Sequence, residues 1–125
     1  MTFRARSHVA AFIPDRGDVI HTDFSPSAGT ETALKHFAIV LTPKAYHEKT
    51  GRAIVCPITS KLRDFPFNIA IPALPPHLPL KGAVLADQVR TINLHARGSS
   101  LAERLDEAAL RDIVDLLFAL LDGQA

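Results

Sequence analysis

Cysteine is almost absent from this 125-residue chain, in which Cys56 is the only one. An internal disulfide is therefore excluded, and this absence is typical of proteins in a reducing cytoplasm. Long apolar runs are also absent, because no segment approaches the ~18 apolar residues that a membrane helix needs. The stretch 9–13 is apolar but too short for a signal peptide, and it ends at Pro14. We therefore expect a cytoplasmic protein with no membrane partner.

Three kinds of site motif are missing. The six histidines show no metal-ligand spacing and there is no cysteine pair, so we expect no metal site. The chain has neither a P-loop nor a Rossmann glycine motif, and no Gly-x-Ser-x-Gly nucleophile elbow. We therefore predict no cofactor. The histidines are His8, His21, His36, His47, His77 and His95.

Net charge is also small, at +1, but the charges are unevenly distributed. Residues 1–100 carry +5 and residues 101–125 carry −4. A basic body with an acidic C-terminal segment permits a local phosphate-binding face.

The length and the apolar fraction of 47% indicate one globular domain. We expect an N-terminal arm over 1–16 and a single domain over 17–125. This domain divides into a β-rich part, 17–98, and a helix over about 106–122. Period-2 alternation and short apolar runs predict a small sheet that closes around its own core, a mainly β, α+β architecture. The predicted strands are 17–24, 37–42, 53–57, 65–72 and 82–89.

The C-terminal helix is predicted from Asp106 as its cap and from an apolar stripe at helical spacing. Leu116 and Phe118 widen the stripe beyond one face, so we expect the helix to bury against a second surface, such as a dimer partner. The stripe consists of Leu110, Ile113, Val114, Leu117, Leu120 and Leu121. Cys56 ends the apolar run 53–56 and is expected to be a buried small side chain rather than a nucleophile.

The candidate chemistry lies in two short polar segments that flank apolar runs. Segment 29–36 precedes the run 37–42 and contains Glu31, Lys35 and His36, and Thr59 follows the run 53–56. If the two runs pair as neighbouring strands, these groups could meet at one end of a sheet. A base, an acid and phosphate-binding donors are what cleavage of RNA by its own 2′-hydroxyl requires. Glu31 is the candidate base, His36 the candidate acid, and Lys35 with Thr59 the candidate donors.

Each of these residues alone is ordinary. An isolated Glu31 or Lys35 is usually a solvated charge, an isolated His36 is more often structural, and Thr59 is more often a turn residue. The hypothesis depends on several such groups gathering at adjacent strand ends.

At these residues the chain resembles the MazF/PemK family of toxin endoribonucleases. The resemblance covers about 14–98, and order and spacing agree throughout. The matching pieces are Arg16-Gly17-Asp18-Val19, Asp23-Phe24-Ser25-Pro26, Gly29-Thr30-Glu31, the run 37–42, Pro57-Ile58-Thr59, 82–92 and Ala96-Arg97-Gly98.

The resemblance implies an SH3-like barrel of the CcdB/PemK type with a C-terminal helix, a homodimer, and an antitoxin protein as partner. It also implies metal-independent cleavage of single-stranded RNA, leaving a 2′,3′-cyclic phosphate and a 5′-hydroxyl. Glu31 and Thr59 fall on the family's active-site Glu and Thr. Contacts to RNA fall on Ser60, Lys61 and Arg63 in one loop, and acid–base or base-reading contacts fall on Asp87 and Gln88 in the last long strand. Lys35 is our further candidate for binding the phosphate.

One departure from the family pattern concerns position 36, where His36 stands in place of a catalytic Arg. Arg binds phosphate through a rigid charged fork, whereas His transfers protons near neutral pH. His36 could replace the Arg as acid, Lys35 could supply the cation, or the enzyme could be weak. The first is our working hypothesis. The alternatives are a non-enzymatic gyrase-inhibiting toxin like CcdB and a degenerate homologue that only binds antitoxin.

Overall fold

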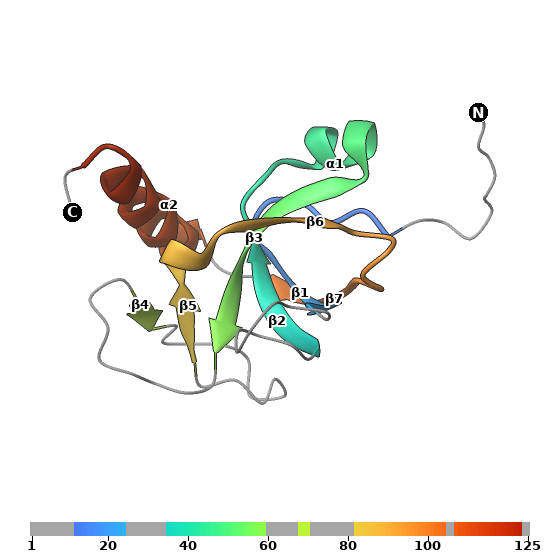
Figure 1. Cartoon of the computed structure of the whole chain (residues 1–125), viewed down its shortest axis with the longest axis horizontal. Coiled ribbons are helices and arrows are strands. Elements are labelled where there is room, and N and C mark those ends of the chain that lie inside the picture. The colour runs from blue at the N-terminus through green and yellow to red at the C-terminus, as the bar shows by residue number, and fades with distance from the viewer. Residues whose placement is uncertain (1–11, 25–34, 60–67, 71–81, 105–106, 124–125) are drawn as a thin grey trace.

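The computed structural model of the chain describes residues 12–24, 35–59, 68–70, 82–104 and 107–123 (Figure 1). Within them lie seven strands, two α-helices and one short 3₁₀ turn, η2. Their bounds are β1 (Asp18–Asp23), β2 (Lys35–Val40), α1 (Lys44–Thr50), β3 (Arg52–Thr59), β4 (Asn68–Ala70), β5 (Ala83–Leu85), η2 (Ala86–Gln88), β6 (Arg90–Asn93), β7 (Ser100–Arg104) and α2 (Glu107–Leu121).

The strands form one antiparallel sheet in the order β4-β5-β3-β2-β1-β7, and β6 pairs with β3 outside this path. β3 is long enough to pair with β6 through Arg52–Val55 and with β5 through Ile58 and Thr59. Because one strand has two partners on the same side, the sheet must curl. The predicted fold class, an SH3-like barrel with a C-terminal helix, is confirmed.

The two faces of this sheet bury separate apolar clusters. On one face, Leu110 and Ile113 of α2 pack against Ile39, Cys56 and Ile58. Each fully buried aliphatic side chain of this kind contributes about 1.5–3 kcal/mol of transfer free energy. Cys56 is buried, as predicted. The inner face of the barrel carries the second cluster, formed by Ile20, Phe24, Ala38, Val40, Ala53, Val55, Ile92 and Leu94.

The single strand predicted over 82–89 is confirmed over Ala83–Leu85 and wrong beyond it. β5 ends at Leu85, whose ψ of 83° is well below the value of about 135° that is typical of antiparallel strands. The chain then turns through η2. It then enters β6 at Arg90 and pairs with the other half of β3. Ala86 is buried in this turn, so an apolar run here reflects an inward-facing turn as well as strands. The sequence also missed β7, which pairs with β1 and has mostly polar residues.

The burial of α2 decreases towards its C-terminal end in the single chain. Leu110 and Ile113 are buried, whereas Phe118 and Leu121 are 63% and 75% exposed. The predicted apolar stripe is therefore fully buried only at Leu110 and Ile113, and Leu117 and Leu120 are half-buried. The predicted cap, Asp106, lies outside the described residues, as do 65–67 and 71–72 of the strand predicted over 65–72.

Near the start of β1, a buried histidine connects three segments of the chain. His47 in α1 is 2% exposed, and each of its ring nitrogens lies 2.8 Å from an oxygen, the Pro14 carbonyl at Nδ1 and the Thr42 hydroxyl at Nε2. Because a carbonyl only accepts, Nδ1 donates and Nε2 accepts the Thr42 hydroxyl hydrogen. The Thr42 oxygen in turn accepts the Ile54 N–H at 3.0 Å.

A buried carboxylate fixes the same end of β1. Asp18 is 6% exposed, its Oδ1 lies 3.0 Å from Arg104 Nη2, and its Oδ2 accepts the Asp15 N–H at 2.8 Å. The start of β1 is thus joined to β7 and to the turn before it.

Candidate active site

Four strand ends lie side by side at one edge of the sheet, namely the end of β1, the start of β2, the end of β3 and the start of β5 (Figure 1). The Cα partners that establish this are Thr22 with His36, Asp23 with Lys35, Phe37 with Ile58, and Thr59 with Ala83. The runs 37–42 and 53–56 therefore belong to neighbouring strands, as the sequence hypothesis required. We call this end of the sheet, where the four strand ends meet, the site edge.

Thr59 ends β3 at the site edge and is half-buried. Beside it the backbone of β5 approaches very closely, because a Cβ built on Gly82 would lie 2.3 Å from the Thr59 carbonyl oxygen and 3.2 Å from Ile58 Cγ2. Real Cβ atoms do not come this near to a backbone oxygen, so only glycine allows the approach. Gly82 therefore helps to determine where the Thr59 backbone lies.

The end of β1 is fixed by the turn that precedes β7. The Asp23 N–H donates to the Arg97 carbonyl at 3.1 Å, and Arg97 Nη1 donates to the Asp23 carbonyl at 3.5 Å. One residue earlier, the hydroxyls of Thr22 and Ser99 are 2.8 Å apart. These contacts bring a guanidinium to the site edge. The sequence gave Arg97 no role, although it belongs to one of the quoted motifs.

The structure describes only part of the predicted catalytic set. It brings the backbone positions of Lys35 and His36, in β2, together with Thr59 in β3. The side chains of Lys35 and His36 lie outside what is described. So do four predicted residues entirely: Glu31, Ser60, Lys61 and Arg63.

Asp87 and Gln88 are not at the site edge. They lie in η2, where Asp87 is exposed and Gln88 is half-buried. Burial and, to a smaller degree, the negative charge of Asp87 raise the pKa of the Cys56 thiol to about 12. Asp87 is therefore near Cys56, and Cys56 precedes Thr59 by three residues in the chain. The RNA contacts predicted for Asp87 and Gln88 would therefore be made to nucleotides that lie away from the Thr59 carbonyl.

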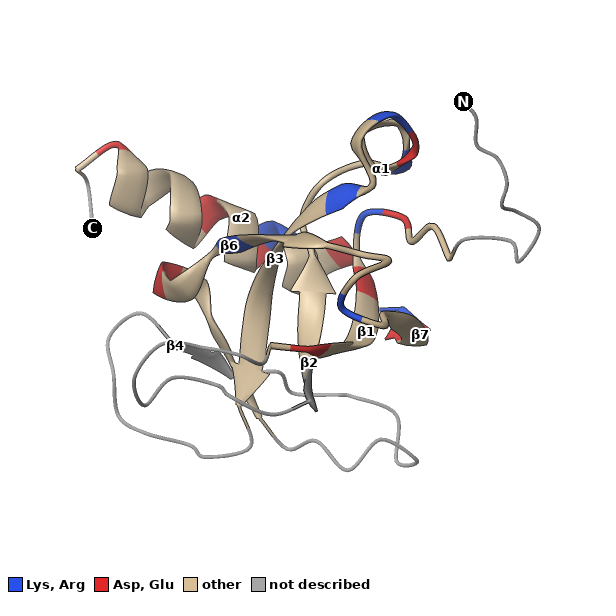
Figure 2. Cartoon of the chain, turned by 45° about the vertical axis from the view of Figure 1, so that its right-hand side comes forward, with Lys and Arg blue, Asp and Glu red and all other residues tan. Residues whose placement is uncertain are grey.

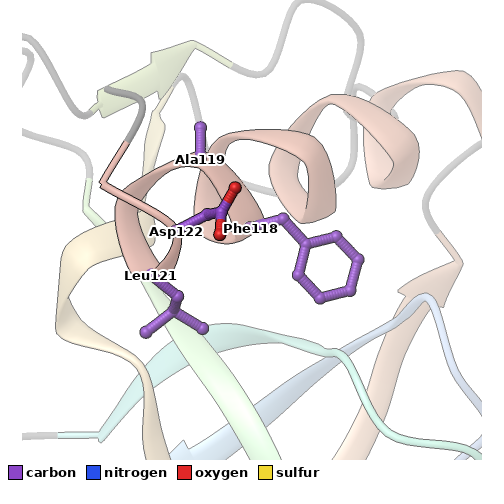
Figure 3. A pocket seen from close by; sticks show the side chains of 4 residues that line it. All are labelled: Phe118, Ala119, Leu121 and Asp122. Carbon is purple, nitrogen blue, oxygen red and sulfur yellow. The ribbon is translucent and has the colours of Figure 1, made fainter.

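Charged residues are unevenly distributed over the described part of the chain. Acidic residues recur along α2 and in η2, whereas a basic residue begins both β3 and β6 (Figure 2). A surface pocket at the end of α2 is lined by Phe118, Ala119, Leu121 and Asp122 (Figure 3). It is built from residues other than those of the site edge. Within the described ranges there is no cluster of three or more His, Cys, Asp or Glu side chains that could hold a metal ion. None of the helices described is long and apolar enough to cross a membrane.

Known proteins share this sequence and this architecture. Residues 15–121 match the family described as PemK-like, MazF-like toxin of type II toxin–antitoxin system. The Escherichia coli K12 endoribonuclease toxin MazF is 37% identical over 92 residues, which are 74% of this chain and 79% of that protein. The crystal structure of MazF from Deinococcus radiodurans has a TM-score of 0.80 and 33% identity, covering 89% of this chain and 98% of that one. A MazE–MazF structure from the same organism has a TM-score of 0.74 and 30% identity, covering 88% and 96%. This chain therefore belongs to the PemK/MazF-like toxin family of type II toxin–antitoxin systems.

Proposed function

We propose that this toxin is an endoribonuclease that cuts single-stranded RNA without a metal ion or cofactor. The observation that carries the proposal is the register of β2 and β3, in which Phe37 faces Ile58 and brings His36 and Thr59 to one edge. The Escherichia coli K12 relative reported above is named an endoribonuclease toxin. This favours the nuclease over the gyrase-poison alternative.

In the proposed reaction, the 2′-hydroxyl of one nucleotide attacks the adjacent phosphorus. Glu31 removes the hydroxyl proton, and His36 protonates the departing 5′-oxygen. Thr59 and Lys35 bind the charged phosphorane oxygens. The products are a 2′,3′-cyclic phosphate and a 5′-hydroxyl, so DNA, which lacks the attacking group, is not cut.

The single-stranded RNA would be held on both sides of the site edge. Ser60, Lys61 and Arg63 follow Thr59 directly in the chain, and Asp87 and Gln88 lie beside Cys56 further from the edge. Specific reading of single-stranded RNA requires contacts to unstacked bases as well as to phosphates. We assign both kinds of contact to these residues.

We also propose a homodimer and an antitoxin partner. Phe118 and Leu121 expose apolar surface around the pocket at the end of α2 (Figure 3). Contiguous exposed apolar surface of this kind marks protein-binding sites. A solved relative is a MazE–MazF structure, which supports an antitoxin as one of the two partners.

The proposed activity is tested by incubating the purified chain with a long RNA in excess EDTA and mapping the new 5′ ends by primer extension. We expect cuts at one short recurring sequence, with fragments that carry cyclic phosphate ends. A DNA copy of the same sequence should stay intact. Absence of cleavage on any long RNA across neutral pH would contradict the proposal, and a supercoiling assay would then test gyrase inhibition.

His36 gives a sharper test of the mechanism. His36→Ala should lower the cleavage rate about 10²-fold or more, because the acid is lost. His36→Arg should preserve or raise activity, since the guanidinium binds the phosphorane. Single-turnover rates on the mapped sequence distinguish these outcomes. Full activity of the Ala variant would remove His36 from the mechanism.

A further inference from the structure

A second arginine lies over the aromatic ring of the residue that follows β1. The Arg90 guanidinium carbon lies 5.0 Å from the centroid of the Phe24 ring. Phe24 follows Asp23, whose Cα partner is Lys35 at the start of β2. The charged end of Arg90 therefore lies against the residue next to the β1 end of the site edge.

The backbone register explains how Arg90 reaches this place. Its Cα faces Val55, which belongs to the inner apolar cluster together with Phe24. Val55 precedes Thr59 by four residues, or about 13 Å of extended strand. The Arg90 side chain extends across the inner face and covers the ring of Phe24, which is fully buried.

The guanidinium of Arg90 contacts an aromatic ring and not a carboxylate. Among the described residues, Arg16 pairs with Glu107 and Arg104 pairs with Asp18, but no carboxylate forms an ion pair with Arg90. Arg90 is half-buried, so part of its side chain lies against the protein. A cation–π contact with a ring does not use the N–H donors of a guanidinium, so these remain able to bind an anion.

We propose that Arg90 binds a backbone phosphate of the single-stranded RNA next to the site edge, and that Phe24 positions its guanidinium. The inference rests on the proposed function, because it names a further contact to the same substrate. It assigns Arg90 to binding and leaves the bond-breaking step to the residues named above.

The test measures RNA affinity as a function of salt. The probe is an RNA of the mapped cleavage sequence with a 2′-deoxyribose before the scissile phosphate, so that it binds without being cut. Arg90→Met removes the charge but keeps an apolar side chain over the Phe24 ring. Arg90→Lys keeps the charge but lacks the planar guanidinium. The matched control is Arg52→Met, because Arg52 is exposed and starts β3 at the end opposite Thr59. Melting temperature is measured for every variant.

For Arg90→Met we expect about tenfold weaker binding near physiological salt, and a log–log salt slope smaller by about 0.7, the value for one single-strand phosphate contact. Arg90→Lys should keep that slope, and Arg52→Met should keep both slope and affinity. Equal losses in Arg90→Met and Arg52→Met, or an unchanged slope in Arg90→Met, would overturn the proposal. If Arg90→Met does not fold, Arg90→Gln decides the question by the same slope. If the parent protein cuts no RNA, the proposed function has failed, and the Arg90 comparison is then made with a plain single-stranded RNA.

Discussion

The two ends of the β1–β2 strand pair are built from different kinds of contact. At the far end, two buried polar side chains, Asp18 and His47, are tied by hydrogen bonds to segments distant in the chain. At that end, α1 and Gly51 connect β2 to β3, and both are among the described residues. At the site edge, by contrast, the strands open into the connections 25–34, 60–67 and 71–81, two of which carry candidate residues.

This contrast separates stability from function within one small sheet. The far end fixes the strands against one another, and the site edge presents their ends to the connecting segments. Placing reactive residues on segments that a fixed scaffold positions is a common arrangement in enzymes. Substitutions at the far end should therefore change folding, and substitutions at the site edge should change cleavage.

Gly82→Ala should give the largest effect on cleavage outside the proposed catalytic residues. The new Cβ would sit 2.3 Å from the Thr59 carbonyl oxygen, so the backbone must move by about 1 Å, and such a displacement can lower a rate about 10²-fold. The matched control is Gly51→Asn at the far end, where a Cβ meets nothing within 4 Å and Asn tolerates the φ of +69°. Single-turnover cleavage rates should fall only for the first variant. Equal rates would show that the site edge tolerates displacement of Thr59.

His47→Ala should destabilise the fold by about 3 kcal/mol, because it creates a cavity and leaves the Pro14 carbonyl and the Thr42 hydroxyl without their partner. Urea denaturation measures this loss, and cleavage per folded molecule should not change. Glu48→Ala, an exposed neighbour on α1, is the control. A stability loss equal to that of the control would mean that the hydrogen bonds of His47 contribute nothing.

Asp18→Asn should have a smaller effect on stability, about 1 kcal/mol, because the Arg104 side chain is 59% exposed and solvent screens the ion pair. The amide oxygen can still accept the Asp15 N–H, but the amide NH2 then faces the Arg104 guanidinium, so both the charge interaction and the contact with Arg104 are lost. Asp115→Asn on the exposed side of α2 serves as control. Reduced cleavage per folded molecule in Asp18→Asn would contradict the separation of the two ends.

The smallest expected effect concerns the reactivity of the Cys56 thiol and its contribution to the pH dependence of stability. Because burial raises its pKa to about 12, the thiol should stay protonated and react slowly with iodoacetamide at pH 8. Unfolding in urea should restore ordinary reactivity. The unfolded chain loses this proton near the ordinary value of 9.0 and the folded chain does not, so the free energy of unfolding should fall as pH rises from 9 towards 12. Rapid alkylation of the native protein would contradict the burial.

Much of the scaffold could be predicted from the sequence, because buried apolar residues recur with a regular period along strands and helices. Ile20, Thr22 and Phe24 alternate along the strand predicted over 17–24, and all three are buried. In the apolar run 37–42, also predicted as a strand, residues 38–40 are buried. For the site, the neighbouring placement of the strands before His36 and Thr59 followed from the same apolar runs.

Features that depend on distant parts of the chain could not be predicted. The break between β5 and β6 arises because β3 offers two pairing segments, which no local pattern reveals. β7 is polar because it lies at the sheet edge, so it lacks the alternation of a buried strand. The contacts of Arg90 and Arg97 could not be predicted, because Phe24 and Asp23 lie far from them in the chain.

The burial of Cys56 has a practical consequence for studying this toxin in solution. Because the chain contains no other cysteine, a thiol introduced at an exposed position such as Glu48 or Asp115 would be the reactive one in the native protein. Fluorophores or spin labels could then be attached to either helix without first replacing the native thiol. Energy transfer between such probes and a labelled RNA would report which helix the nucleic acid approaches.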